Sequence, residues 1–367
     1  ASMFVVPVFN IPITSHILVL LIFLISDLEI RFDNQDSFSD MVTITKSQND
    51  LRSFQYKVLG NDLKVVLVSD PETEKGAATL TVRAGSMADP ADIQGLAHFC
   101  EHMLFLGNEK YPVENDYANY LKQHGGSKNA STSLEYTTYY FDIAADHLEG
   151  ALDRLAQFFI SPLFTESGVD REMNAVNAEN RKNYNNDDRK LFQLWRQEAN
   201  SESKYNGFST GNLTTLQVEG IRDRLIKYYD ESYSANLMTL TIVGRQPLET
   251  LVEWASTYFS EIPNKSLPLP QYFDPAPYPL GSMSKLYKID PVKDKHYLRL
   301  RWAIPATREF YKSKPMNYFS ALIGHEGPGS LLSLLIKKNL ALELSSSTYD
   351  PFDGFGQFDV RILLTDK

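Results

Sequence analysis

Short apolar runs separated by polar turns begin near residue 51 and predict strands. Residues 63–69 (LKVVLVS) and 78–84 (ATLTVRA) are rich in valine and threonine, and a turn-like Asp-Pro-Glu sequence follows the first of them. β-Branched residues in runs of this length, bounded by turn residues, are typical of strands. Residues 130–144 contain three tyrosines and a phenylalanine among threonines, which predicts that the chain returns to strand structure here.

Longer segments with apolar residues at helical spacing predict helices in the same region. One segment runs from 93 to 106 and stops at Gly107, and a second, 113–124, ends at a Gly-Gly pair typical of a helix C-cap. Residues 146–160 are amphipathic and stop at a Ser-Pro pair, and residues 169–185 have a polar face. The pattern then predicts a strand at 237–243 and a helix at 248–259.

A proline-rich segment separates this region from a second one with a similar order of elements. Six of the 18 prolines lie between residues 263 and 279, which predicts an extended linker. Two strands, two helices and two strands follow, the order also predicted for residues 63–144, so we infer an internal structural repeat. The expected parts are an unassigned tail (1–41), a first domain (42–262), the linker (263–283) and a second homologous domain (284–367).

The second repeat is shorter than the first in this sequence. Its last predicted strand, 358–364, lies near Lys367, whereas the first repeat continues into a helix at residue 146. A half-finished sheet would expose a strand edge, so we expect a truncated portion of a longer protein. The tail contains an apolar run, 17–25, which is shorter than the ~20 residues needed to span a bilayer and lacks the basic start of a secretory signal. We therefore assign no role to residues 1–41.

The candidate chemistry lies in the sequence HFCEH at residues 98–102, inside the first predicted helix. Residues four apart share a helix face, so His98 and His102 would project to the same side. Neutral imidazole is a common zinc ligand, and a catalytic zinc takes three protein ligands and leaves a fourth position to water. Glu101 would stand close enough to that position to accept the proton of the water. The motif H-x-x-E-H is the inverse of the H-E-x-x-H zinc-protease motif.

The alternative for this motif is a pair of helix histidines held by hydrogen bonds in the core. In that case Glu101 would be solvated or paired with a lysine. With 7 histidines in 367 residues, chance would produce the motif with odds of about one in a hundred. A third ligand is not fixed by spacing, but Glu172 and Glu179 share a face of the predicted helix, since seven residues are within about 20° of two turns. One could ligate while the other orients the site.

Composition narrows the class of protein. The 36 lysines and arginines against 46 aspartates and glutamates give a net charge of −10, which argues against a nucleic-acid partner and gives no reason to expect binding to an anionic membrane surface. No stable membrane insertion is expected. Cys100 is the single cysteine, so no internal disulfide can form, which fits a reducing compartment and predicts a cytoplasmic protein. On the predicted helix Cys100 lies on a different face from the histidines, as a packing residue.

Several of these runs together resemble the pitrilysin family of zinc peptidases with an inverted motif. They are HFCEHMLFLG (98–107), Tyr111-Pro112, LEGALDRLAQFF (148–159) and EMNAVNAE (172–179), and the resemblance covers residues 42–365. It implies an α+β fold of antiparallel and mixed sheets packed with helices, in repeated two-layer units, the second of them truncated here. It also implies a missing C-terminal half that closes around the substrate and contributes an arginine and a tyrosine to the reaction.

The resemblance implies a role for both carboxylates of the polar helix. Glu179 would be the third ligand of one Zn²⁺ per chain, beside His98 and His102, and the first domain would be the catalytic one. Glu172 would act with Glu101 as an accessory catalytic carboxylate, and the alternative for Glu172 is an ordinary solvated helix acid. The second domain carries no ligands at the corresponding helix and would be metal-free.

The resemblance also implies substrate-binding residues. Asn129, next to Ala130, would polarise the scissile carbonyl beside a strand edge to which the substrate adds as an extra strand. Simple turn chemistry is the alternative for Asn129. Gly324 and Glu326 would anchor the amino terminus of the substrate, and a loop with one solvated acid is equally compatible with them.

The expected function is that of a zinc-dependent metalloendopeptidase acting on small to mid-sized peptides. One alternative is a noncatalytic peptide-binding subunit of the same family, against which the complete set of His98, Glu101, His102, Glu172 and Glu179 argues. Another is a fragment that is inactive without its missing half. The expected partners are peptide substrates and that missing half, and a homodimer of the full-length form stays open.

Overall fold

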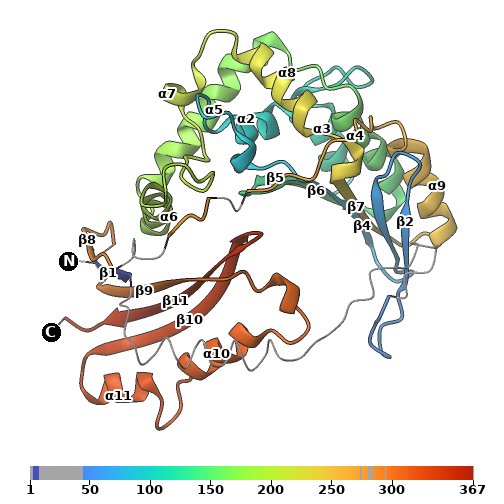
Figure 1. Ribbon diagram of the computed structural model, residues 1–367. Coiled ribbons are helices and arrows are strands. Elements are labelled where there is room, and N and C mark those ends of the chain that lie inside the picture. Colours follow the sequence, from blue (N-terminus) through green and yellow to red (C-terminus); the bar gives the residue numbers. More distant parts are fainter. Residues whose placement is uncertain (1–2, 8–43, 273–274, 280–283, 294, 367) are drawn as a thin grey trace. The chain divides into compact units, whose positions relative to one another are not determined.

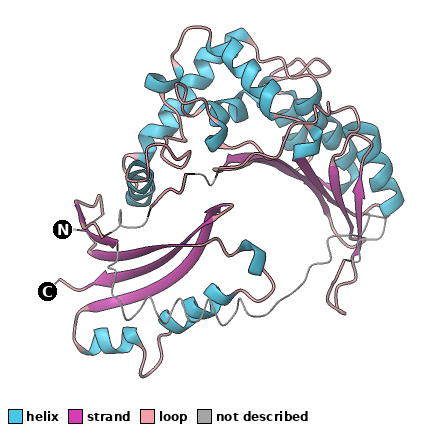
Figure 2. Cartoon of the chain, viewed as in Figure 1, coloured by secondary structure: helices cyan, strands magenta, loops and turns pink. Residues whose placement is uncertain are grey.

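The computed structural model describes residues 3–7, 44–272, 275–279, 284–293 and 295–366 (Figure 1). The chain divides into two compact units. We call residues 40–184 and 207–270 the motif unit, and residues 1–39, 185–206 and 271–367 the C-terminal unit. Each is considered by itself, and Figure 2 shows how helices and strands are distributed along the chain.

The motif unit contains a six-stranded mixed sheet in the order β2-β3-β7-β4-β6-β5. Only β3 and β7 run parallel, and all other neighbours are antiparallel. Among the described residues, β5 pairs with β6 alone and is therefore an edge strand. The strands are β2 (Ser53–Val58), β3 (Lys64–Ser69), β4 (Lys75–Val82), β5 (Ser127–Thr132), β6 (Thr137–Ala144) and β7 (Met238–Gly244).

Helices cover one face of this sheet, so the motif unit has two layers (Figure 1). Side chains of β3, β4, β6 and β7 alternate between buried and more exposed positions, and the buried ones share a single apolar core with the helices. The helices are α2 (Leu96–Met103), α3 (Asp116–Gln123), α4 (Leu148–Ile160), α5 (Glu166–Asn183), α7 (Leu213–Leu216), α8 (Ile221–Ser232) and α9 (Leu248–Phe259).

The C-terminal unit contains a five-stranded sheet in the order β10-β11-β9-β1-β8. β1 lies parallel to β9 and antiparallel to β8. The strands are β1 (Met3–Pro7), β8 (Tyr287–Ile289), β9 (Tyr297–Ile304), β10 (Ala341–Phe352) and β11 (Phe355–Leu364), and the helices are α6 (Asp187–Gln197), α10 (Pro315–Ile323) and α11 (Leu331–Lys337).

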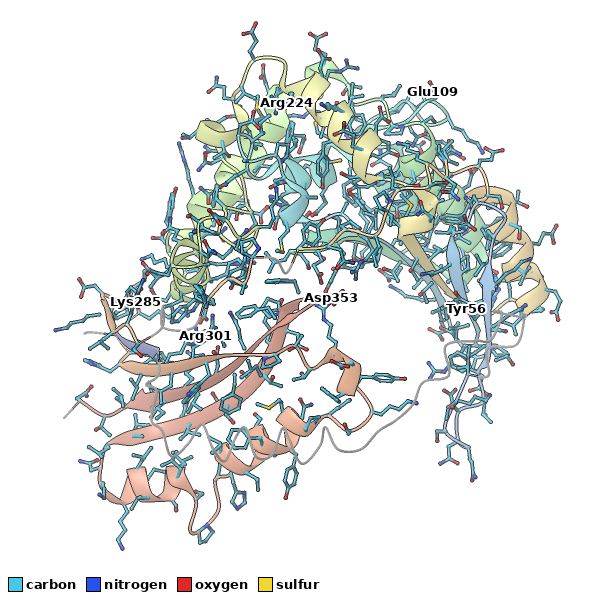
Figure 3. The ribbon with its side chains drawn as sticks, viewed as in Figure 1. Tyr56, Glu109, Arg224, Lys285, Arg301 and Asp353 are labelled. Atoms are coloured by element: carbon cyan, nitrogen blue, oxygen red, sulfur yellow. The ribbon has the colours of Figure 1, made fainter. Side chains whose placement is uncertain are left out.

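Alternation along β9 explains how this sheet is covered. Leu300 and Trp302 pack in the apolar cluster that includes residues of α10 and α11. Arg301, labelled in Figure 3, lies between them in sequence, and its guanidinium carbon stands 4.6 Å from the Trp195 ring of α6. The Arg301 Nε atom donates to Asp359 Oδ1 of β11 at 2.6 Å. Successive side chains of a strand point to opposite faces, so α6 and the α10–α11 pair cover different faces.

The α+β fold with sheets packed against helices is confirmed. The prediction of strands within 130–144 gave no position for the turn between them. The structure places β5 and β6 on either side of a tight turn, in which the Ser133 amide donates to the Tyr136 carbonyl at 2.8 Å. The strand β2 was not predicted. The tail was given no role, yet residues 3–7 form β1, while the apolar run 17–25 lies outside the described residues.

The predicted domain boundaries and the two compact units divide the chain differently. Residues 185–206, which the prediction places in the first domain, pack within the C-terminal unit. Units are groups of residues in contact, whereas the predicted domains are copies of a repeat, so the boundaries remain a prediction. The proline-rich segment is tied to its surroundings, since the Ala235 amide donates to the Pro263 carbonyl and the Asn200 amide to the Pro277 carbonyl. None of the helices in the described part of the chain combines the length and apolar character needed to cross a membrane.

Candidate metal centre

The helix that carries the motif is fixed at its start by a buried carboxylate. Asp89, which is 7% exposed, accepts hydrogen bonds from the backbone amides of Gly95 and Ala97, both at 2.7 Å. These amides belong to the first turn of α2, where backbone N–H groups have no partner within the helix. A negative charge at a helix N-terminus also interacts favourably with the helix dipole. Asp89 therefore sets the position of the motif helix.

The two histidines of α2 project to the same side. The ring centroids of His98 and His102 lie 4.8 Å apart, and both side chains are partly exposed. Phe99, Cys100 and Met103 are fully buried on other faces of the helix. The prediction that the histidines share a face is confirmed, and so is the packing position of Cys100.

A carboxylate of α5 completes the group. Glu179 Oε2 lies 3.6 Å from His98 Nε2 and 3.8 Å from His102 Nε2. One ligand atom from each of these residues lies within 4.8 Å of the other two. Tetrahedral ligands about 2.0–2.2 Å from a zinc ion are roughly 3.3–3.6 Å apart. The three groups therefore fit a tetrahedral metal ion after a small inward movement, with the fourth position open.

Each histidine is oriented through its other ring nitrogen. His98 Nδ1 lies 2.7 Å from the backbone carbonyl oxygen of Thr210, so Nδ1 donates and Nε2 keeps its lone pair for a metal. His102 Nδ1 lies 3.2 Å from Glu172 Oε2 on α5, and Glu172 precedes Glu179 by about two turns on the same helix face. Such partners fix the tautomer and ring orientation of metal-binding histidines.

The charges of the group favour a cation between them. Burial lowers the pKa of His102, but hydrogen bonds to Glu172 and Glu179 raise it by more than burial lowers it. The pKa of His102 is therefore raised, to about 9. The hydrogen bond from His102 lowers the pKa of Glu172 against the effect of burial. Carboxylates thus surround the imidazoles and stabilise positive charge, which a divalent ion would supply when the imidazoles are neutral.

Glu101 is the buried acid of this site. It is 7% exposed, and burial raises the pKa of its carboxyl group, opposed by the charges of the two histidines and by a hydrogen bond from Thr132. The Thr132 hydroxyl donates to Glu101 Oε2 at 2.6 Å. A carboxyl group with a raised pKa is suited to accept and return a proton near neutral pH. Thr132 lies on the edge strand β5, so this strand also orients the acid.

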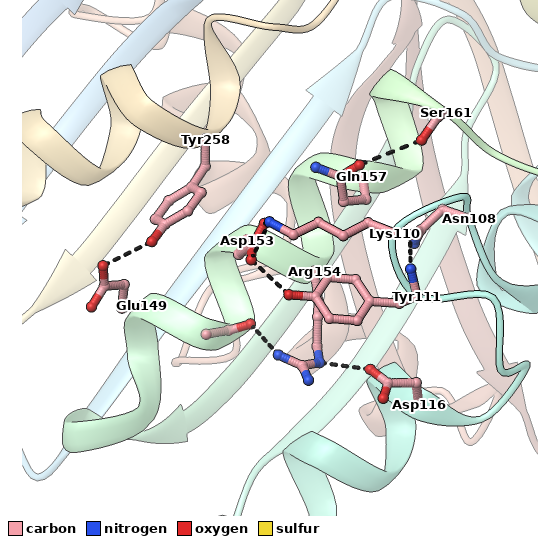
Figure 4. A network of polar contacts seen from close by, with 11 residues as sticks. Asn108, Lys110, Tyr111, Asp116, Glu149, Asp153, Arg154, Gln157, Ser161 and Tyr258 are labelled. Atoms are coloured by element: carbon pink, nitrogen blue, oxygen red, sulfur yellow. Dashed lines mark hydrogen bonds and ion pairs between the residues drawn. The ribbon is translucent and has the colours of Figure 1, made fainter.

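The segment after the motif helix is held by a polar network (Figure 4). The Tyr111 hydroxyl donates to Asp153 Oδ2 of α4 at 2.6 Å, and Lys110 pairs with the same carboxylate at 2.8 Å. Burial and the bond to Asp153 raise the pKa of Tyr111 to about 12. Arg154 joins α4 to Asp116 of α3 at 2.7 Å. The end of the motif segment is thereby anchored to α4.

The predicted substrate residues fall into both units. Asn129 and Ala130 lie on β5; Asn129 is exposed, and Ala130 packs against the core. Along the strand Asn129 is only three residues before Thr132, which binds Glu101. Gly324 ends α10, and Glu326 is exposed in the loop that follows, both in the C-terminal unit. The substrate-binding roles of all four residues stay predictions.

Three residues that position the site were not found from the sequence. They are Asp89, Thr132 and Thr210. An Asp shortly before a helical segment is a known N-cap signal that could have indicated Asp89. A break of 130–144 into a hairpin would have placed Thr132 on its own strand. Nothing local marks Thr210, because its contact to His98 is made by a backbone carbonyl.

The fold and the site together define an α+β protein in which an H-x-x-E-H helix and a carboxylate from a second helix form a group that could hold a metal ion. A family model described as insulinase (peptidase family M16) matches residues 64–208, and one described as the peptidase M16 inactive domain matches residues 221–367. The chain belongs to this family, as an insulysin-like member of the pitrilysin type.

Individual relatives support the same assignment. The insulin-degrading enzyme of Homo sapiens is 47% identical over 330 residues, which make up 88% of this chain and 32% of that protein. The A-factor-processing enzyme of Saccharomyces cerevisiae is 43% identical over 328 residues, 88% of this chain and 32% of that protein. The crystal structure of pitrilysin matches with a TM-score of 0.81 and 34% identity, over 88% of this chain and 35% of that chain. The chain spans about a third of the length of these curated relatives.

Proposed function

We propose that this chain carries the metal-binding part of a zinc-dependent metalloendopeptidase that hydrolyses small to mid-sized peptides. The observation that supports this most directly is the convergence of His98, His102 and Glu179 beside the buried carboxyl group of Glu101. Two imidazoles and one carboxylate with a fourth position left open are the ligands typical of catalytic zinc, while structural zinc sites use four protein ligands. The proposed partners are peptides and the rest of the full-length protein.

In this proposal each residue of the site has one task. Nε2 of His98, Nε2 of His102 and Oε2 of Glu179 would hold the ion. When bound, zinc lowers the pKa of a water molecule and polarises a carbonyl group. Glu101 accepts the proton of the attacking water at its carboxylate and returns it to the leaving amine nitrogen. Thr132 keeps Oε2 of Glu101 in place by its hydrogen bond.

The edge of β5 is the proposed site for the peptide backbone. In the part of the chain that the structure describes, this strand pairs on one side, so its other side offers backbone groups to which a peptide can add as a strand. Asn129 would donate from its side-chain amide to the carbonyl oxygen that becomes negative, and loss of one such donor typically costs about 2.7–4 kcal/mol in the transition state. Ala130 lines the same strand, and Gly324 with Glu326 would hold the substrate amino group.

The test is zinc stoichiometry combined with cleavage of an unfolded peptide of middle length, for the wild type and for Glu101→Gln. We expect one zinc per chain in both proteins, and chelator-sensitive cleavage only in the wild type, supplied with the remainder of the full-length protein if needed. A Glu101→Gln variant that cleaves at the wild-type rate would contradict the role of Glu101. Absence of zinc binding would instead favour a noncatalytic peptide-binding subunit.

One further outcome separates the remaining alternatives. If the 367-residue chain binds zinc but cleaves only after the rest of the protein is added in trans, it is a fragment that is inactive alone. The single cysteine, Cys100, supports a reducing and therefore cytoplasmic environment for the protein.

A further inference from the structure

Lys128 places a positive charge over an aromatic ring beside the metal centre. It lies on β5, and its Nζ atom stands 3.7 Å from the centroid of the Phe105 ring. The Phe105 ring packs against two core rings. Its centroid lies 6.4 Å from that of Tyr117 and 5.1 Å from that of Phe158. The ring is therefore fixed, and Lys128 covers the side that the core leaves free.

The ammonium group of Lys128 is partly buried and keeps its hydrogen-bonding capacity. Within the described residues, its side chain makes no hydrogen bond or ion pair, and Phe105 is its close partner. Burial lowers the pKa of Lys128, while the charges of Glu172 and Glu101 oppose this effect. An ammonium group has three N–H donors and no acceptor, and a partly desolvated one interacts more strongly with an anion than a solvated one does.

Its position relates it to both the proposed proton acceptor and the proposed peptide edge. Lys128, Ala130 and Thr132 alternate with more exposed residues and so share one face of β5. Thr132 on this face holds Glu101. Phe105 follows Glu101 by four residues, so its ring lies one helical turn away, with about 5–6 Å between the Cβ atoms of such neighbours. A peptide on the edge of β5 would bring a side chain close to Lys128.

We propose that Lys128 is a specificity-determining residue that pairs with an aspartate or glutamate side chain of the bound peptide, close to the bond that is cut. This inference rests on the proposed function. The Lys128 ammonium, whose side chain has no hydrogen-bond or ion-pair partner among the described residues, would donate a charge-assisted hydrogen bond to an acidic peptide side chain. The same peptide with glutamine in place of glutamate has no charge to pair with the ammonium group. The preference should therefore appear as a difference in binding affinity between the two peptides.

The experiment measures peptide binding by the zinc-loaded 367-residue chain carrying Glu101→Gln, so that no cleavage is needed. A set of fluorescent peptides carries one glutamate, moved through the sequence, and each is paired with its glutamine counterpart. We expect at least one glutamate peptide to bind about 5-fold tighter than its counterpart at low salt, an advantage that shrinks as salt increases.

Three substitutions, each added to the Glu101→Gln chain, separate the effect of the Lys128 charge from the effect of its packing on Phe105. Lys128→Met keeps an unbranched apolar side chain over Phe105 and should abolish the glutamate advantage, whereas Lys128→Arg should retain it. Lys122→Met, at an exposed position of α3, is the matched control and should leave the advantage unchanged. Zinc stoichiometry and melting temperature verify that each variant is folded.

Several results would overturn the assignment of Lys128. They are equal affinities within every peptide pair, an advantage that survives Lys128→Met, or no binding of any peptide. None of these results concerns hydrolysis, which is tested separately with the wild-type residue at position 101. A failure of the Lys128 proposal is thus distinguishable from a failure of the proposed peptidase function.

Discussion

The backbones of Gly95 and Gly211 are in direct contact, since a Cβ atom built on Gly95 would stand 2.2 Å from the Gly211 Cα. Gly95 precedes α2 with a φ of 92°, a left-handed conformation that side chains other than glycine rarely adopt. Gly211 follows Thr210, whose carbonyl oxygen accepts the hydrogen bond of His98. The close approach of the two glycines therefore brings the Thr210 carbonyl to the His98 ring.

Replacement of Gly95 by alanine should damage both stability and metal binding. The added methyl group meets backbone atoms and the left-handed φ is strained, so we expect a loss of about 2–5 kcal/mol in the free energy of unfolding. Urea unfolding of the metal-free chain measures this loss, and zinc titration of the folded fraction should show weaker binding. Gly60→Ala is the control, because a Cβ there meets nothing within 4 Å. Equal effects of the two substitutions would refute the packing argument.

Removal of the Asp89 carboxylate should destabilise the motif helix. Two backbone amides lose their acceptor in Asp89→Ala, and the loss of a helix N-cap typically costs about 0.5–2 kcal/mol, so we expect the upper end of this range at this buried position. The measurement is thermal unfolding without metal. Asp92→Ala serves for comparison, because Asp92 is exposed and pairs with Arg224 at 2.9 Å. That surface pair should contribute less than about 1 kcal/mol. A larger loss for Asp92→Ala than for Asp89→Ala would contradict the prediction.

Glu172 should affect zinc affinity without being a ligand. Glu172→Gln removes the carboxylate that orients His102, and loss of such a partner typically weakens metal binding about 10–100-fold. Competition with a zinc chelator of known affinity measures the change. The same substitution at Glu166, an exposed residue in the first turn of α5, should leave zinc affinity unchanged. If both variants bind zinc like the wild type, Glu172 has no orienting role.

Stability should depend on pH through a pair of stacked histidines. The rings of His124 and His147 lie 3.5 Å apart, and partial burial, His147 and Arg154 lower the pKa of His124. The folded chain therefore binds this proton less readily than the unfolded chain, so stability is lost as the pH falls through the ordinary histidine range near 6.5 and is regained as the pH rises.

The variant His124→Gln should show a shallower dependence of stability on pH. Urea unfolding between about pH 5 and 7.5 measures the difference from the wild type, in the presence of a chelator, so that metal release does not contribute. The unfolding free energies of the two proteins should converge at the alkaline end. Identical slopes across this range would show that the stacked pair does not couple to folding.

The sequence predicted those parts of the site that depend on local geometry. Helical spacing was sufficient to place His98 and His102 on one face, and glycine and proline marked most helix ends. Glu179 could not be selected from spacing, because the geometry that brings α5 to α2 depends on packing of the whole core; it came from a family resemblance. The Thr132 contact was missed because the turn between β5 and β6 was not located, and a one-residue difference in register decides which face a side chain occupies.

Contacts made by backbone atoms were also beyond the sequence analysis. The Thr210 carbonyl reaches His98 across 112 positions, and any residue type has such a carbonyl. The packing of α6 against β8 and β9 was equally hidden, since Leu191 and Trp195 look like the apolar face of any helix and meet residues about a hundred positions away. Such contacts depend on tertiary arrangement and leave no local pattern.

The thiol of Cys100 can report local unfolding of the motif helix α2. It is the single thiol of the chain, it is fully buried between the two histidines in sequence, and burial raises its pKa, so it cannot react while α2 is in place. Its alkylation rate therefore measures how often α2 separates from the core by local unfolding. Because an ion bound by His98, His102 and Glu179 would fasten α2 to α5, added zinc should slow the alkylation.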